Sequence, residues 1–160
     1  VIAMGLPWLL GVLIPEFTCA ELAYCLAGAG CFLGHAFPVF FKFKGGKGVT
    51  VGAAIALMID WRIFLIILAV FVIVFIITHI VSVSSISAAA AIIVAAVLFF
   101  VFKVGNFSVY RLVLAAFAGV SVIYLHRSNI GRLIRGEEKK FTYKKRSAKT
   151  EENAQNKEEA

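Results

Sequence analysis

Acidic side chains are almost absent from the first 125 residues of this 160-residue chain. The only carboxylates there belong to Glu16, Glu21 and Asp60, and 61% of the whole chain is hydrophobic. Together with a mean hydropathy of +0.94, this excludes a soluble globular protein, because so uniform an apolar surface would not stay in water. The composition therefore predicts one integral membrane domain.

Other absences bear on metal sites, disulfides and signal peptides. The three cysteines, Cys19, Cys25 and Cys31, are six residues apart, which spreads them over different faces of a helix. We therefore expect neither a metal site nor a disulfide among them. The chain begins with Val1 inside an apolar run, without a basic leader or a cleavage box, so we expect an N-terminal truncation rather than a signal peptide.

Long apolar runs separated by short polar breaks make up most of the chain. About 20 helical residues cross the hydrocarbon of a bilayer, and only helices pair their own backbone groups there. We predict an all-α fold, a polytopic transmembrane helical bundle of about six helices, one of them short or partly re-entrant. The expected helices are residues 1–14, 17–33, 49–59, 63–81, 86–102 and 111–125.

Basic residues gather after the last apolar run. Ten of the sixteen Lys and Arg residues, and six of the nine acids, follow Leu125, so the net charge of +7 mostly reflects this tail. A basic segment after a hydrophobic helix favours contact with anionic lipid headgroups rather than with nucleic acid. We expect a membrane domain over residues 1–138 and a polar, disordered tail over residues 139–160.

The short segment 49–59 decides the topology. If it crosses the membrane, the lysine-rich loop before it, the serines at 82–85 and the basic tail all lie on one face. The positive-inside rule favours that arrangement, with the preceding loop dipping into the membrane.

A cationic loop rich in glycine is the most unusual feature of the apolar region. Gly45, Gly46, Lys47 and Gly48 directly precede a predicted helix start at Val49. Glycines let backbone N–H groups approach a ligand, and a helix N-terminus favours an anion, so the loop indicates a phosphate cradle. It lacks the spacing of a Walker A loop. The alternative is an ordinary flexible loop with cytoplasmic lysines.

Two further polar groups could complete such a site. Asn129 and Arg132 share one helical face just after the last span, and an arginine can hold a phosphate through two parallel hydrogen bonds. The alternative is a plain basic run beside the membrane. Hydroxyls at Ser82 and Ser85 interrupt two spans and form either a polar floor or local backbone hydrogen bonds.

Taken together, these motifs resemble one enzyme family. The pattern G-H-x-F-P-x-F-x-x-F-K-G-G-K-G at residues 34–48, followed by H-R-x-N-I-x-R-L-x-x-G-x-E at residues 126–138, is similar to the bacterial acyl-phosphate:glycerol-3-phosphate acyltransferases. The resemblance implies transfer of a fatty acyl group from acyl phosphate to the 1-hydroxyl of glycerol 3-phosphate, giving lysophosphatidic acid and phosphate. It implies no cofactor and no metal.

The resemblance also implies a location and a set of site residues. We expect a multi-pass protein of the bacterial plasma membrane, with its active face and C-terminus cytoplasmic. A different function class, a non-enzymatic transporter or binder of a phosphorylated small molecule, stays open. The implied catalytic residues are His35, Lys47, Asn129 and Glu138, and the implied phosphate-binding residues are Gly45, Gly46, Lys47, Gly48, Ser82, Ser85 and Arg132.

The sequence departs from the family pattern in several places, which concern the catalytic base and the family's first motif. The residue five positions after His35 is Phe40, so the His–Asp dyad of another acyltransferase class is absent, and a substrate phosphate is the expected proton acceptor. Thr50-Val51 replaces the usual Ala-Thr, and His79 stands where the family carries arginine. The family's Ser-Gly-Asn motif is not in this sequence, so we expect the chain as given to lack one wall of its site.

Overall fold

The computed structural model describes residues 20–38 and 45–141. Within these ranges the chain is helical and contains no strand, which confirms the predicted all-α membrane bundle. The predicted helix at residues 1–14 lies outside the described residues. The elements are α2 (Ala20–Ala36), α3 (Val49–Ile59), α4 (Trp61–Thr78), α5 (Val81–Val101), η2 (Val104–Asn106), α6 (Val109–Leu125) and α7 (Arg127–Ile134).

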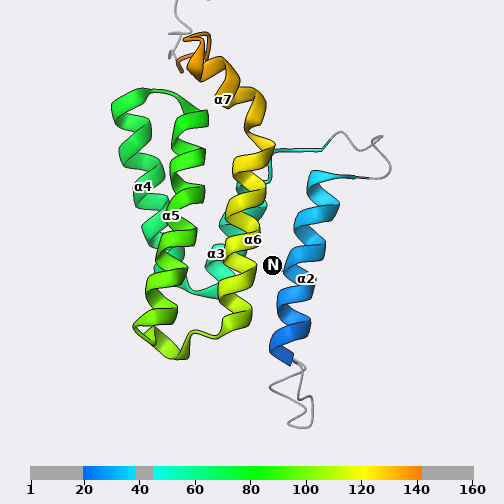
Figure 1. Ribbon diagram of the computed structural model, residues 1–160. Coiled ribbons are helices and arrows are strands. Elements are labelled where there is room, and N and C mark those ends of the chain that lie inside the picture. The colour runs from blue at the N-terminus through cyan, green and yellow to red at the C-terminus, as the bar shows by residue number, and fades with distance from the viewer. Residues whose placement is uncertain (1–19, 39–44, 142–160) are drawn as a thin grey trace, which may run out of the picture.

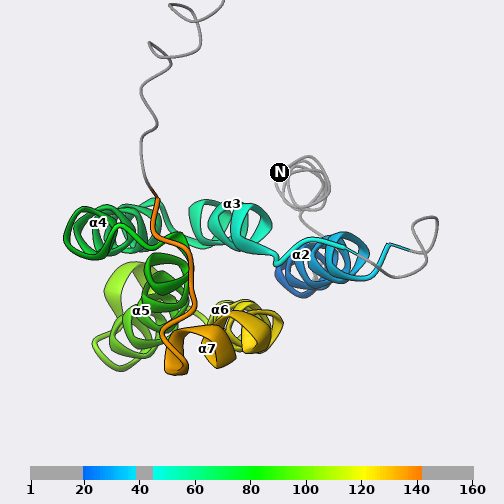
Figure 2. The same ribbon diagram turned by 90° about the horizontal axis from the view of Figure 1, so that it is seen from above.

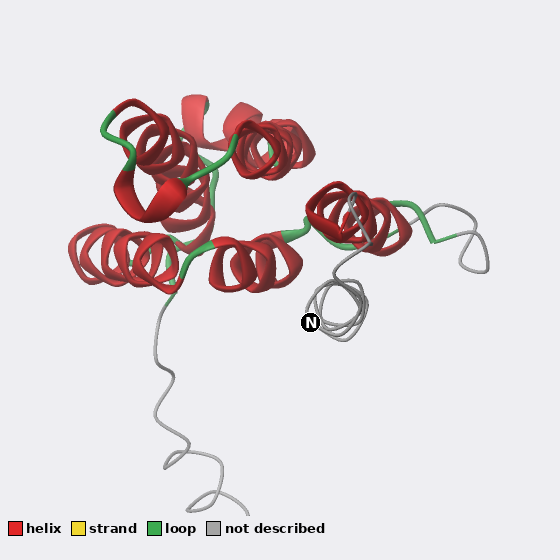
Figure 3. Ribbon diagram, turned by 90° about the horizontal axis from the view of Figure 1, so that it is seen from below, coloured by secondary structure: helices red, strands yellow, loops and turns green. Residues whose placement is uncertain are grey.

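The helices α2 to α6 lie side by side, and α7 extends from one end of the bundle (Figure 1). Seen along the bundle, α3 and α4 form one row and α5 and α6 another, with α2 next to α3 and α6 (Figure 2). The view from the opposite side shows that short loops join most of these helices (Figure 3). By length and composition, α4 and α5 can cross a membrane, as can α6 and α7 together if that pair, bent by 52°, is one span.

The short helix α3 runs antiparallel to α4, as the preferred topology requires. Consequently the loop before Val49, the α4–α5 turn at His79 and the start of α7 all lie at one end of the bundle (Figure 1). A hydrogen bond from Asn129 to Ser82 joins the start of α7 to the start of α5. We call this the site end. Asp60 and the α5–α6 turn lie at the opposite end.

The serines do not break the helices as the sequence predicted. The hydroxyls of Ser84 and Ser85 donate to the carbonyls of Ile80 and Val81, four residues earlier, so both serines join the first turns of α5. The break lies at His79, which ends α4 in the left-handed conformation with φ 53°. The predicted aqueous tail after Leu125 also begins with a helix, α7.

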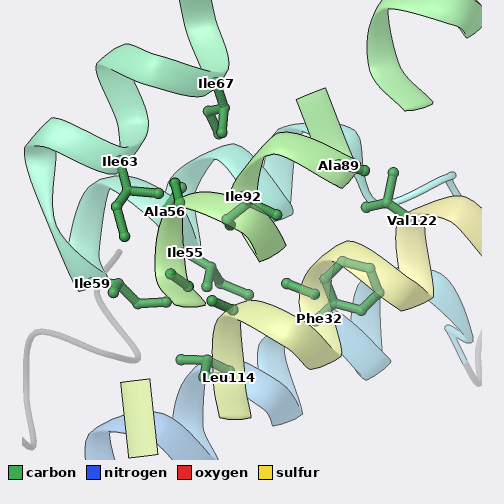
Figure 4. Close-up of a cluster of buried hydrophobic side chains, with 14 of the residues drawn as sticks. Phe32, Ile55, Ala56, Ile59, Ile63, Ile67, Ala89, Ile92, Leu114 and Val122 are labelled. Atoms are coloured by element: carbon green, nitrogen blue, oxygen red, sulfur yellow. The ribbon is translucent and has the colours of Figure 1, made fainter. Parts of the chain in front are cut away.

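Small residues let α5 and α6 pack closely. Ala89, Ala96 and Ala115 are buried at this contact, and larger side chains such as Phe32, Ile55, Ile63 and Ile92 fill the neighbouring core (Figure 4). Gly119 marks the tightest point, because a Cβ there would lie 2.7 Å from the carbonyl oxygen of Ala89 and 2.6 Å from the Ile93 side chain. In lipid, such backbone approach is a main source of helix association.

Two ion pairs lie at the end opposite the site, one between α2 and α6 and one within the first turn of α4. Glu21 of α2 accepts hydrogen bonds from Ser108 at 2.7 Å and from Arg111 of α6 at 2.9 Å. Asp60 caps α4 by accepting from the Arg62 amide, and its carboxylate pairs with the Arg62 guanidinium at 2.8 Å. The polar groups of this end therefore satisfy one another.

The α5–α6 contact gives a first stability test. We expect Gly119→Ala to lower the free energy of unfolding in detergent by about 1–3 kcal/mol, because the new methyl group overpacks a fixed carbonyl. Gly30→Ala is the matched control, since nothing lies within 4 Å of a Cβ at Gly30 on α2. Equal thermal stability of the two variants would contradict the close packing at Gly119.

Candidate functional site

Glu138 joins two helices at the site end. Its carboxylate accepts hydrogen bonds from Asn129 Nδ2 at 2.7 Å and from Arg132 Nε at 2.7 Å, both on α7, and also from the Ser82 hydroxyl on α5. Asn129 Nδ2 donates to Ser82 Oγ as well, at 2.7 Å. We call Ser82, Asn129, Arg132 and Glu138 the carboxylate cluster. The predicted common face of Asn129 and Arg132 is confirmed by their shared partner.

Asn129 is oriented by this carboxylate. A carboxylate oxygen can only accept, so the amide nitrogen must face Glu138 and the amide oxygen must point away. The Asn129 side chain is buried, and its Oδ1 has no hydrogen-bond partner among the described residues. A buried acceptor without a donor is costly, which marks Oδ1 as a place where a ligand hydroxyl can donate.

A helix-capping turn brings Glu138 back toward α7. Gly136 has φ 70°, the Glu137 amide donates to the Arg132 carbonyl at 2.9 Å, and the Gly136 amide donates to the Leu133 carbonyl at 3.0 Å. These two bonds form a Schellman motif, which favours glycine at the left-handed position. The chain therefore reverses directly after α7, and the second residue beyond Gly136 reaches Arg132.

His126 is the site residue that the sequence analysis did not single out. It lies at the bend between α6 and α7, is 2% exposed, and its Nδ1 lies 2.8 Å from the Val122 carbonyl oxygen. Because that oxygen only accepts, Nδ1 carries the proton and Nε2 keeps a lone pair. His126 directly precedes α7, which carries Asn129 and Arg132 of the carboxylate cluster.

The described part of the glycine loop, residues 45–48, packs against the end of α2. A Cβ on Gly45 would lie 2.3 Å from the carbonyl oxygens of His35 and Ala36, and one on Gly48, with φ 75°, would lie 2.4 Å from the Phe32 ring. Gly48 caps α3 without a side-chain hydrogen bond, so the first N–H groups of α3 lack a capping side chain. Phosphate binding by this loop stays a prediction.

The predicted residues His35 and Lys47 have different surroundings. The His35 ring lies against Gly46, where a Cβ would approach Nε2 to 2.5 Å. His35 therefore shapes the loop at the end of α2. Lys47 is exposed and forms no ion pair with any described residue. Its charge is thus available to a ligand at the site end.

The predicted phosphate-binding serines face different parts of the molecule. Ser82 belongs to the carboxylate cluster. Ser85 instead donates a hydrogen bond to the Val81 carbonyl and lines an apolar cavity of about 360 Å³. The cavity lies between α3, α4, α5 and α6. Its lining includes Thr50 and Gly52 of α3, Phe64 and Phe71 of α4, Ala88 and Ile92 of α5, and Gly119 and Val122 of α6.

The hydrogen bonds to Glu138 predict that the folded protein loses stability in acid. Bonds from Ser82, Asn129 and Arg132 lower the pKa of Glu138 from 4.5 to about 2, against the opposing effect of burial. A lowered pKa stabilises the folded protein fully above pH 4.5, and this contribution is lost as the pH falls from 4.5 toward about 2. We expect the melting temperatures of the wild type and Glu138→Gln to converge over that interval. A constant difference from about pH 7 to about pH 3 would contradict the paired carboxylate.

Comparisons with known proteins agree on one family. A family model described as glycerol-3-phosphate acyltransferase matches residues 2–136. The curated glycerol-3-phosphate acyltransferase of Prochlorococcus marinus (strain NATL2A) is 36% identical over 130 residues, which are 81% of this chain and 65% of that protein. The one from Thermoanaerobacter sp. (strain X514) is 33% identical over 135 residues, 84% of this chain and 65% of that protein. The chain thus spans slightly less than two thirds of these relatives.

Solved structures share the fold. The glycerol 3-phosphate form of PlsY, an integral membrane glycerol 3-phosphate acyltransferase, aligns with a TM-score of 0.67 at 32% identity, covering 87% of this chain and 69% of that one. The lysophosphatidic acid form aligns with a TM-score of 0.65 at 35% identity, covering 75% and 58%. With a family model matched over most of its length and this fold in common, the chain belongs to the glycerol-3-phosphate acyltransferase family.

Proposed function

We propose that this protein transfers a fatty acyl group from acyl phosphate to the 1-hydroxyl of glycerol 3-phosphate. The products are lysophosphatidic acid and inorganic phosphate. The observation that carries the proposal is the polar site end beside an apolar cavity. A substrate with a phosphate head and a hydrocarbon tail needs both. The family and the names of its relatives support the same reaction.

The cavity suits the acyl chain. Its lining is hydrophobic apart from hydroxyls such as those of Thr50 and Ser85, which lie toward the site end. Val122 also lines the cavity, and it lies one helical turn before His126. The volume of about 360 Å³ lies within the usual range of ligand pockets. An acyl carbonyl at the upper end of the cavity would therefore meet the polar groups of the site.

Cations and backbone donors at the same end suit the phosphates. Lys47 provides a mobile charge, the N-terminus of α3 provides backbone N–H groups, and Arg132 provides guanidinium donors in addition to the Nε bound to Glu138. The Arg132 side chain is 42% exposed, so its remaining donors are accessible. Two anionic substrates can be held in register by these groups.

The chemistry requires little more than positioning. The hydroxyl oxygen of glycerol 3-phosphate forms a bond with the acyl carbon, the bond from that carbon to the phosphate oxygen breaks, and the departing phosphate takes the hydroxyl proton. Asn129 Oδ1 accepts a hydrogen bond from the attacking hydroxyl and orients it. The protein therefore contributes position rather than a base to this step.

The distribution of charge supports an orientation in the membrane. Arg127, Arg132, Arg135, Lys139 and Lys140 follow α6 at the site end, together with Lys47. The opposite end carries Arg62, Lys103 and Arg111, two of which pair with acids. By the positive-inside rule, we propose a bacterial plasma membrane protein whose site end faces the cytoplasm.

Product formation tests the proposal directly. Membranes containing the full-length protein, given acyl phosphate and labelled glycerol 3-phosphate, should form labelled lysophosphatidic acid. Lys47→Ala should raise the KM of a phosphorylated substrate roughly tenfold to a hundredfold, because a charged hydrogen bond is lost. Lys103→Ala, at the opposite end, is the control and should not change the rate. Labelled substrate that crosses proteoliposomes without forming product would instead indicate a transporter.

The cavity predicts the preference for acyl-chain length. Ala88→Leu places three more carbons on the cavity lining, so we expect the preferred acyl phosphate to be shorter by roughly three carbons. Ala90→Leu makes the same change on an exposed position of α5 that does not line the cavity. Competition between acyl phosphates of different length measures the preference. An unchanged profile in Ala88→Leu would exclude this cavity as the acyl site.

A further inference from the structure

Glu138 lies on a segment without regular structure of its own. Residues 137–141, which we call the strap, follow α7 and cross the site end toward the turn between α4 and α5 (Figure 2). The upstream end of the strap is fixed by the Schellman motif at Gly136. A carboxylate that bridges α5 and α7 also needs the chain after it to be held, because a free downstream end would let the strap swing away.

The downstream end is held at Phe141. Its amide donates to the carbonyl oxygen of His79 at 2.7 Å, and its ring meets the Phe75 ring edge to face, with centroids 5.8 Å apart. The His79 ring approaches the same Phe75 ring at 6.4 Å, and Phe71 stacks on Phe75 from the next turn of α4 at 6.2 Å. Phe141 thus docks on an aromatic group at the end of α4.

The conformation of His79 makes its carbonyl available. His79 adopts φ 53° and ends α4, and its own amide donates to the Phe75 carbonyl at 2.8 Å. The helix stops there, so the His79 carbonyl is not used by a continuing α-helix and can accept from Phe141. The bond from Phe141 connects the end of α4 to the strap only three residues after Glu138.

We propose that Phe141 is a positioning residue, which holds the strap across the bundle and thereby fixes the Glu138 carboxylate against Ser82, Asn129 and Arg132. This inference rests on the proposed acyl transfer for its kinetic consequences. Phe141 touches none of the groups that we assign to the substrates. It is 60% exposed, so its ring adds little to the buried core.

The role of Phe141 predicts a loss of activity without loss of the fold. In Phe141→Ala we expect the rate of lysophosphatidic acid formation to fall roughly three- to tenfold, the difference that one aromatic contact makes. Phe141→Tyr keeps the edge-to-face contact and should restore the rate. The melting temperature should stay that of the wild type. Phe102→Ala removes a phenylalanine that is 72% exposed at the opposite end, and serves as the control.

Two further measurements separate positioning from a general effect. If Phe141 acts through Glu138, then Glu138→Gln should reduce the rate less in Phe141→Ala than in the wild type. Hydrogen exchange, which does not depend on activity, should show faster exchange of the strap amides in Phe141→Ala and unchanged exchange in the helices.

The outcomes distinguish the two proposals. A full-length wild-type protein that forms no product contradicts the acyltransferase function, and the exchange experiment still tests the strap. An active Phe141→Ala protein with the wild-type rate and wild-type strap exchange overturns the role of Phe141. Fully multiplicative effects of Phe141→Ala and Glu138→Gln would overturn the link between them.

Discussion

The length of α3 is the constraint on which the site depends. At 1.5 Å per residue its 11 residues span about 16 Å, whereas the 18 residues of α4 span about 27 Å, and the two helices meet at Asp60. The N-terminus of α3 therefore ends within the height of the bundle rather than at its edge. The glycine loop follows it inward, and the cavity lies beside α3, where Phe64, Leu68 and Phe71 of α4 line it together with Val49 and Thr50.

The glycines of this loop are explained by close packing as well as by the predicted phosphate cradle. A cradle for phosphate and a tight contact with α2 both require residues without Cβ atoms, and Gly45 and Gly48 meet the second requirement by direct geometry. The loop is thus held by Phe32 and by the end of α2. A rigid loop costs less entropy when it binds an anion, so packing and binding favour the same sequence.

Much of this arrangement can be predicted from the sequence, because few backbone structures other than helices are stable in lipid. Apolar runs and the positive-inside rule predict the bundle and the common end of the glycine loop, Ser82 and Arg132. The helical spacing of Asn129 and Arg132 predicts their shared face. The sequence predicts a break at residues 82–85 and leaves local backbone hydrogen bonds open for the serines. Such bonds from Ser84 and Ser85 to carbonyls four residues earlier keep this segment helical. His126 begins the pattern at residues 126–138, but its burial at the bend between α6 and α7, like the docking of Phe141 on α4, depends on tertiary contacts.

The strap has a consequence for the order of biosynthesis. Its contacts join the last described residues to α4 and α5, which are made some sixty residues earlier in the chain. While the ribosome is still adding α7, the helices can already pack, but Ser82 and Asn129 have no carboxylate to share. The carboxylate cluster is therefore completed only when Glu138 has left the ribosome, after α2 to α7 have been made.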